Sequence, residues 1–136
     1  PMWTDLVEPL QKSGVKLLIA HLGEPDVRLG FGQPGFQALC RLGRETGAVM
    51  KLSAPFRSAA HSSPYPDVEP FVAAIVDAFG LDRCVWGSDW PFIDTAHQVD
   101  YGDLLRLVKR WLPNPADQER VLWDNPARFF GFTESC

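Results

Sequence analysis

The stretch Cys84-Val85-Trp86-Gly87-Ser88-Asp89-Trp90-Pro91 decides the fold, because a short apolar run ends there in a carboxylate and a Trp-Pro turn. Such a run predicts a buried strand, here residues 83–88. In proteins with parallel strands and covering helices, catalytic groups lie at the carboxyl ends of the strands, so Asp89 is the first candidate for chemistry. The alternative is local, because Asp is also common in turns, where its side chain hydrogen-bonds nearby backbone.

Two further runs end in the same way. Residues 15–20 lead into His21, and residues 48–52 lead into Ser53. Each run is short and apolar, and each follows a stretch with helical character, which predicts an α/β fold of parallel strands with right-handed crossovers. The polar groups then gather on one rim of the sheet: His21 and Glu24, Lys51 and Arg57, Ser88 and Asp89.

Apolar spacing and capping residues locate the helices. A helix over 67–79 has Asp67 as its predicted N-cap, Pro70 in its first turn and Gly80 as its end. Further helices are predicted at about 5–13, at 35–44, at 101–111, after Asn114-Pro115, and from Asn125-Pro126 to Gly131.

Composition excludes several functions. The 136 residues fit one domain, and a formal net charge of −4 without a basic patch makes nucleic acid and anionic membranes poor partners. No apolar run approaches the roughly 20 residues of a membrane span. The start Pro1-Met2-Trp3 does not resemble a signal peptide, and three widely spaced cysteines fit reduced thiols, so we expect a cytoplasmic protein.

One motif is misleading. Residues 30–35 match the G-x-G-x-x-G pattern, but no strand precedes them and no acidic residue follows at the required distance, so nucleotide binding is not predicted. His61 and His97 are expected to be solvated loop residues. Lys51 and Arg57 are either solvated cations or a clamp for a substrate carboxylate, with Arg57 the better geometry.

Four ordered motifs together resemble a known family. They are His21-Leu-Gly-Glu-Pro-Asp26, Lys51-Leu-Ser53, Trp86-Gly-Ser-Asp-Trp-Pro91 and Asn125-Pro-Ala-Arg-Phe-Phe-Gly131. They are similar to the C-terminal half of the amidohydrolase-2 family, and in particular to 2-pyrone-4,6-dicarboxylate lactonases and related sugar lactonases. The resemblance implies that residues 1–136 are the C-terminal portion of a distorted (β/α)₈ barrel, with about three parallel strands and flanking helices.

The resemblance also implies roles for the rim. Asp89 would be the general base for water, His21 would bind or polarise the substrate carbonyl, and Arg57 would bind a carboxylate. We further expect Lys51, Ser88 and Trp90 to contact substrate, with Trp90 as the wall of a pocket. The implied function is hydrolysis of a carboxylate-bearing lactone or related cyclic ester, and the apolar rings of Trp86 and Trp90 are expected to flank Asp89.

Two departures from the family limit these expectations. This chain has Gly23-Glu24-Pro25-Asp26 where those lactonases have Gly-Arg-Pro-Asp, which disfavours a dicarboxylate substrate. The His-x-His pair of the family's first strand is missing, as are about five strands of a barrel that usually needs about 250 residues.

These absences leave alternatives open. We expect no tightly bound metal here, because His21 and Asp89 are two ligands and a catalytic zinc needs three, although the complete enzyme could hold a divalent metal such as zinc. The alternatives to a lactonase are a metal-dependent decarboxylase and a non-catalytic fragment. Open sheet edges predict self-association or pairing with the missing N-terminal half. Without such pairing, the apolar residues Leu17, Ile19, Met50, Leu52 and Val85 would meet water.

Overall fold

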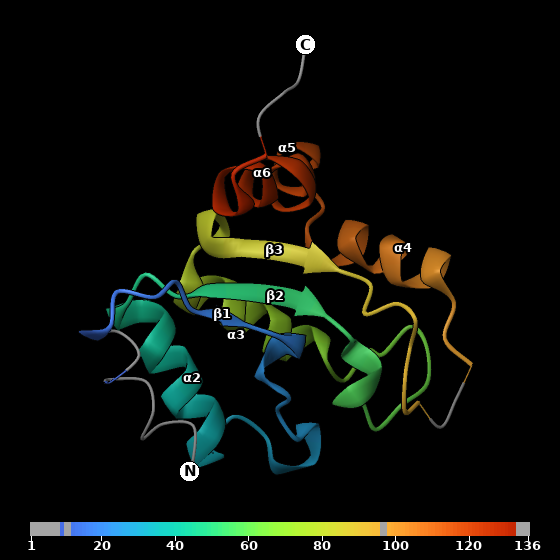
Figure 1. Ribbon diagram of the computed structural model, residues 1–136. Coiled ribbons are helices and arrows are strands. Elements are labelled where there is room, and N and C mark those ends of the chain that lie inside the picture. Colours follow the sequence, from blue (N-terminus) through green and yellow to red (C-terminus); the bar gives the residue numbers. More distant parts are fainter. Residues whose placement is uncertain (1–8, 10–11, 96–97, 133–136) are drawn as a thin grey trace.

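The sheet has three parallel strands, as the sequence predicts. The computed structural model describes residues 9, 12–95 and 98–132, and the strands are β1 (Leu18–Ile19), β2 (Val49–Ser53) and β3 (Cys84–Gly87). Their order is β1-β2-β3, with Leu18 opposite Val49 and Met50 opposite Cys84 (Figure 1). The parallel pairing confirms the predicted succession of βα units.

The first strand is shorter than predicted. Residues 15–20 were expected to be extended, but the ladder covers only two of them. The chain leaves the extended conformation at His21 and Leu22, whose φ angles are 53° and 58° and which begin a 3₁₀ turn over His21–Gly23. Ala20 is still extended, so this turn begins directly after the predicted end of the strand, and most of the missing pairing is at residues 15–17.

Helices cover one side of the sheet and one of its edges. In Figure 1, α3 lies behind the sheet beside α2, and α5 and α6 lie beyond β3. The helices are α2 (Pro34–Glu45), α3 (Glu69–Phe79), α4 (Tyr101–Trp111), α5 (Pro115–Glu119) and α6 (Asn125–Phe130), with a π-helical turn over Arg120–Asp124 between the last two. The helix predicted at about 5–13 falls mostly outside the described residues. Within the described part of the chain, no helix is long and apolar enough to cross a membrane.

The helix ends follow the capping rules with two exceptions. Gly80 ends α3 and Asn114 caps α5 by accepting the N–H of Ala116 at 3.0 Å, both as predicted. Asp67 is not the N-cap of α3, which begins at Glu69; its carboxylate instead accepts the N–H of Ala60 at 2.6 Å. Asn125 opens α6 but is buried, and its amide donates to the carbonyl oxygens of Leu81 and Cys84 at 2.8 and 2.7 Å.

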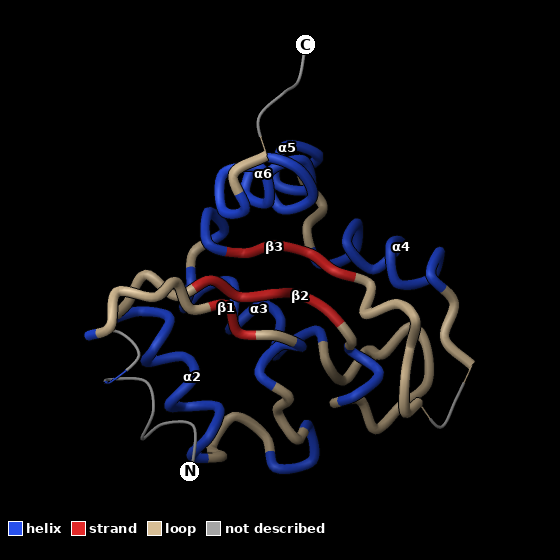
Figure 2. The backbone as a smooth tube through the Cα atoms, viewed as in Figure 1, coloured by secondary structure: helices blue, strands red, loops and turns tan. Residues whose placement is uncertain are grey.

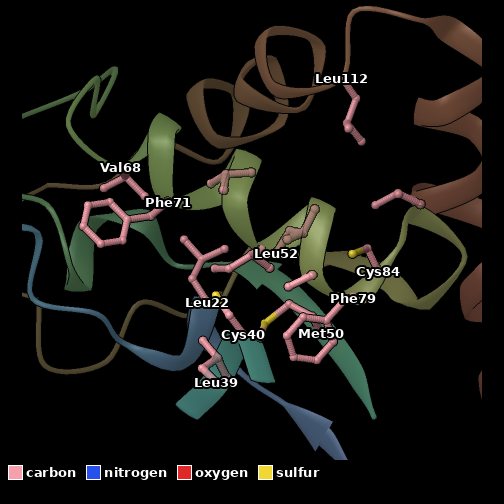
Figure 3. Packing of buried hydrophobic residues seen from close by; sticks show 14 of the residues in the cluster. Leu22, Leu39, Cys40, Met50, Leu52, Val68, Phe71, Phe79, Cys84 and Leu112 are labelled. Carbon is pink, nitrogen blue, oxygen red and sulfur yellow. The ribbon is translucent and has the colours of Figure 1, made fainter. Parts of the chain in front are cut away.

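The core lies between the sheet and the helices. Met50, Leu52 and Cys84 are at most 1% exposed and pack with side chains of α2 and α3 such as Leu39 and Phe79 (Figure 3). Burial in these apolar surroundings raises the pKa of the Cys84 thiol to about 12. Cys40 is also buried, and neither thiol forms a disulfide.

One expectation about the sheet was wrong. Met50, Leu52 and Ile19 were expected to meet water, but alternation along the strands places them on the side of the helices. Leu17 also packs against this core, and Val85, which lies on the other face, is only 2% exposed.

The opposite face of the sheet has a different composition. Alternation and register place Lys51, Ser53, Val85 and Gly87 there together, since a Cβ added at Gly87 would lie 3.2 Å from Lys51 Cδ and 3.7 Å from Ser53 Cβ. No described helix crosses in front of β2 or β3 on this face in Figure 1.

Candidate active site

The parallel strands bring three segments of the chain to one edge of the sheet. His21 follows β1, Ser53 ends β2 and Asp89 follows β3, while Arg57 ends the 3₁₀ turn Pro55–Arg57. In Figure 2 the loops that leave β2 and β3 lie together at the ends toward which both strands run. The expected rim is therefore present, and its side chains come from segments more than 30 residues apart.

The Asp89 carboxylate is the centre of this rim. Its Oδ2 accepts a hydrogen bond from Nε of Arg57 at 2.8 Å, and its Oδ1 lies 3.5 Å from Nε2 of His21. The Asp89 side chain is 16% exposed. The alternative was that Asp89 only stabilises the turn that follows β3. In that turn, however, it is the Ser88 hydroxyl that accepts the N–H of Trp90, at 3.1 Å. Asp89 is thus oriented by long-range partners.

The sequence analysis did not assign a role to Ser53, which orients His21. Its Oγ accepts the backbone N–H of His21 at 3.2 Å and lies 3.2 Å from Nδ1 of the same residue. Because Ser53 Oγ accepts this backbone N–H, its own hydroxyl proton can be donated to Nδ1 of the ring. A neutral imidazole then carries its proton on Nε2, the nitrogen that faces Asp89. Ser53 is 1% exposed. The signal that the sequence offered for its role was its position at the end of a predicted buried strand.

The rim also holds most of the unusual backbone. Eight non-glycine residues among those described have a positive φ, and all but Tyr65 lie in the segments that follow the strands. They include His21 at 53°, Ala54 at 50° and Asp89 at 68°. Non-glycine residues in this region cost free energy and concentrate at functional sites.

Two open hollows meet at Arg57. One, of about 640 Å³, is lined by Glu24, Pro25, Asp26, Arg28, Arg57, Ser58, Ala59 and Ala60. The other, of about 380 Å³, is lined by Glu24, Phe56, Arg57, Ala59, Asp94, Thr95 and Val99. Arg57 therefore connects both hollows to Asp89, and a second bond from its Nη2 to the carbonyl oxygen of Ile93 at 3.0 Å fixes its position.

The other predicted substrate contacts are more scattered. Lys51 lies beside Gly87 on the face of the sheet opposite α2 and α3, and Ser88 is engaged in the turn. Trp90 is 72% exposed and lines neither of the two hollows.

The expectation that two tryptophans flank Asp89 was wrong. Trp86 alternates onto the helix side of β3, where its ring packs edge-on against Tyr101 with 5.9 Å between ring centroids. His61, expected to be solvated, is exposed and lies 3.5 Å from the Asp67 carboxylate, and His97 lies outside the described residues.

The family is shown by comparison with known proteins. The sequence pattern of the amidohydrolase family matches residues 2–132. The chain belongs to the amidohydrolase family. It is 38% identical over 118 residues to the 4-sulfomuconolactone hydrolase of Rhizobium radiobacter, covering 85% of this chain and 39% of that protein. The chain thus spans about two fifths of the length of that relative.

Solved structures agree with the fold. A Pseudomonas putida protein named as a 2-pyrone-4,6-dicarboxylic acid hydrolase is 30% identical, with a TM-score of 0.82 over 95% of this chain and 48% of that one. An amidohydrolase from Burkholderia multivorans with bound zinc is 23% identical, with a TM-score of 0.68 over 94% of this chain and 50% of that one. The expected fold, part of an amidohydrolase (β/α)₈ barrel, is confirmed.

The amidohydrolase chain supplies an incomplete ligand set for a metal. His21 and Asp89 would provide two ligands, and no group of three metal-ligating side chains occurs within the described residues. A catalytic zinc requires three protein ligands, so these residues alone do not fit the ion.

Proposed function

We propose that this amidohydrolase hydrolyses a lactone, or a related cyclic ester, of a small organic acid that carries a carboxylate. The observation that carries the proposal is the Asp89 carboxylate, which contacts Arg57 at 2.8 Å and approaches His21 to 3.5 Å at the carboxyl ends of parallel strands. The lactone-hydrolase names of the relatives support the reaction class.

In this proposal Asp89 is the general base. Its carboxylate takes a proton from a water molecule as the water oxygen attacks the lactone carbonyl carbon. Negative charge then develops on the carbonyl oxygen, and the Nε2–H of His21, set by Ser53, donates to it. The ring C–O bond breaks, and the leaving alkoxide takes back the proton held by Asp89, which regenerates the carboxylate.

Arg57 holds the substrate in this scheme. The guanidinium uses Nε for Asp89 and one Nη2 hydrogen for Ile93, which leaves Nη1 and the second Nη2 hydrogen for a substrate carboxylate. Lys51, Ser88 and Trp90 remain proposed substrate contacts. Free, buried thiols at Cys40 and Cys84 support a reducing, cytoplasmic setting.

We further propose that residues 1–136 act as the C-terminal portion of a barrel. The remaining strands would cover the face that carries Lys51 and Ser53, either from an N-terminal half or from a second copy. The coverage of 39% of a relative's length supports this arrangement.

The test is substitution of Asp89 in the protein that carries this chain, with any segment encoded in frame before Pro1. A panel of lactones is assayed by acid release with a pH indicator. Asp89→Asn should lower turnover by at least about 10²-fold, as expected for loss of a general base, with little change in melting temperature. Asp77→Asn, which removes an exposed carboxylate on α3, is the matched control and should keep full activity.

Three results would contradict the proposal. Retained turnover in Asp89→Asn would remove this residue from the role of base. Release of carbon dioxide instead of acid, abolished by a chelator, would favour a metal-dependent decarboxylase. A complete barrel with no turnover of any lactone in the panel would favour a non-catalytic role.

A further inference from the structure

Glu24 lines both hollows beside Arg57. The proposed mechanism, with Asp89 as general base and His21 as donor to the carbonyl oxygen, gives Glu24 no role. We propose that Glu24 is a specificity-determining residue that limits the site to lactones with a single negative charge. This inference rests on the proposed function, because it concerns the substrate of the same site.

Backbone contacts fix Glu24 relative to the catalytic group. Its N–H donates to the carbonyl oxygen of His21 at 2.9 Å, and its φ angle is 48°. Leu22 on one side is fully buried, and Pro25 on the other is also buried. The carboxylate therefore projects from a short turn whose two ends are anchored, three residues after His21.

The charges around Glu24 are unequally compensated. Asp26 accepts two bonds from the Arg28 guanidinium, at 2.8 and 2.7 Å, and this partner lowers its pKa. Asp89 is paired with Arg57. Among the described residues, neither Glu24 nor Asp94, which shares the second hollow, forms an ion pair with a cation.

A bound substrate would therefore be attracted by the Arg57 cation and repelled by the Glu24 carboxylate wherever it carries a second negative charge. One carboxylate can bind Arg57, but a second one in either hollow lies near the uncompensated Glu24 carboxylate. Repulsion between the two like charges weakens binding of the second carboxylate, and the effect grows where water is partly excluded. Hydroxyl groups, in contrast, can donate hydrogen bonds to Glu24, so the favoured ligand is a monoanionic or hydroxylated lactone.

The experiment compares unreactive monoanions and dianions of similar length. Butyrate and glutarate are titrated into the protein, and the ratio of their dissociation constants is measured by NMR or calorimetry. Glu24→Gln should shift this ratio toward glutarate by roughly three- to tenfold, and Glu24→Arg should shift it further. Asp77→Asn, an equal change of charge on α3, should leave the ratio unchanged.

Two binding outcomes would overturn the inference. One is a ratio that stays within twofold of the starting protein in both Glu24 variants. The other is a ratio that stays unchanged after Arg57→Gln, because the charge filter requires the first carboxylate to sit on Arg57 and should be lost without it.

The lactone assay separates this inference from the proposed function. A shifted binding ratio without turnover of any lactone would support the role of Glu24 and reject the lactonase. Turnover of monoanionic and dianionic lactones with equal kcat/KM, unaltered by Glu24→Gln, would support the lactonase and reject the role of Glu24.

Discussion

At the scale of single residues, Ser53 shows how one hydroxyl can select the ring tautomer of His21, a candidate catalytic residue. The Ser53 hydroxyl contacts both the backbone N–H and the ring Nδ1 of His21, and the residue is only 1% exposed. Removing it leaves two polar groups of His21 without their partner, which generally costs about 1–3 kcal/mol.

Ser53→Ala should therefore lower the free energy of unfolding by about that amount and change the tautomer of His21. Denaturant titration measures the first effect, and ¹⁵N NMR of the His21 ring measures the second. Ser58→Ala is the matched control, because the Ser58 hydroxyl oxygen is buried without a hydrogen-bond partner and its removal should cost little. An unchanged His21 spectrum in Ser53→Ala would contradict the orienting role.

At the scale of elements, the close approach of α2 and α3 depends on a glycine. A Cβ added at Gly43 in α2 would lie 2.5 Å from a ring carbon of Phe79 in α3, and Phe79 is itself fully buried. The two helices meet with little space between them, so any added carbon must displace the ring.

Gly43→Ala should therefore destabilise the protein by about 1–3 kcal/mol, as overpacking in a core does. Gly35→Ala, in the first turn of the same helix, places its Cβ in open space and should be neutral or slightly stabilising. Thermal or denaturant unfolding of both variants measures the difference. Equal stability of the two would show that α2 and α3 can separate at no cost.

Prediction from the sequence succeeded where the signal is local. Apolar runs located β2 and β3, and Gly80 and Asn114 marked helix ends correctly. It failed where the outcome depends on distant partners. Asp67 looked like a cap but binds the backbone of Ala60.

The site was predictable only in outline. The strand ends indicated which residues share the rim, because parallel strands end at the same edge. The pairing of Asp89 with Arg57 and of His21 with Ser53 spans 32 residues in each case, so no local pattern could reveal it. The position of Trp86 was within reach, since alternation from the buried Cys84 already places it on the helix side of β3.

At the scale of the whole molecule, the sheet remains open. Within the described residues β1 pairs only with β2, so its outer edge has no neighbouring strand. Exposed aromatic side chains also gather near the carboxyl-terminal helix, where Trp123, Phe130 and Phe132 are 62%, 52% and 68% exposed. Unpaired edges and apolar patches favour association with another polypeptide.

We therefore expect the isolated 136-residue chain not to be a stable monomer. Sedimentation velocity at micromolar concentration should show self-association, or a complex when a polypeptide with the remaining strands is added. A compact monomer with a cooperative melting transition would show that three strands close their own core, and the half-barrel interpretation would then be wrong.

The left-handed residues of the rim have a consequence for how this protein can change. Each such non-glycine residue costs on the order of 1 kcal/mol or more, and seven of them follow the strands. Leu22 and Ala54 are fully buried and Phe92 packs against the core, so their side chains are needed for stability, but Asp94 is exposed and takes no part in the proposed chemistry. Glycine or asparagine at Asp94 relieves backbone strain without touching His21 or Asp89, so laboratory selection for heat resistance has room here to separate durability from activity.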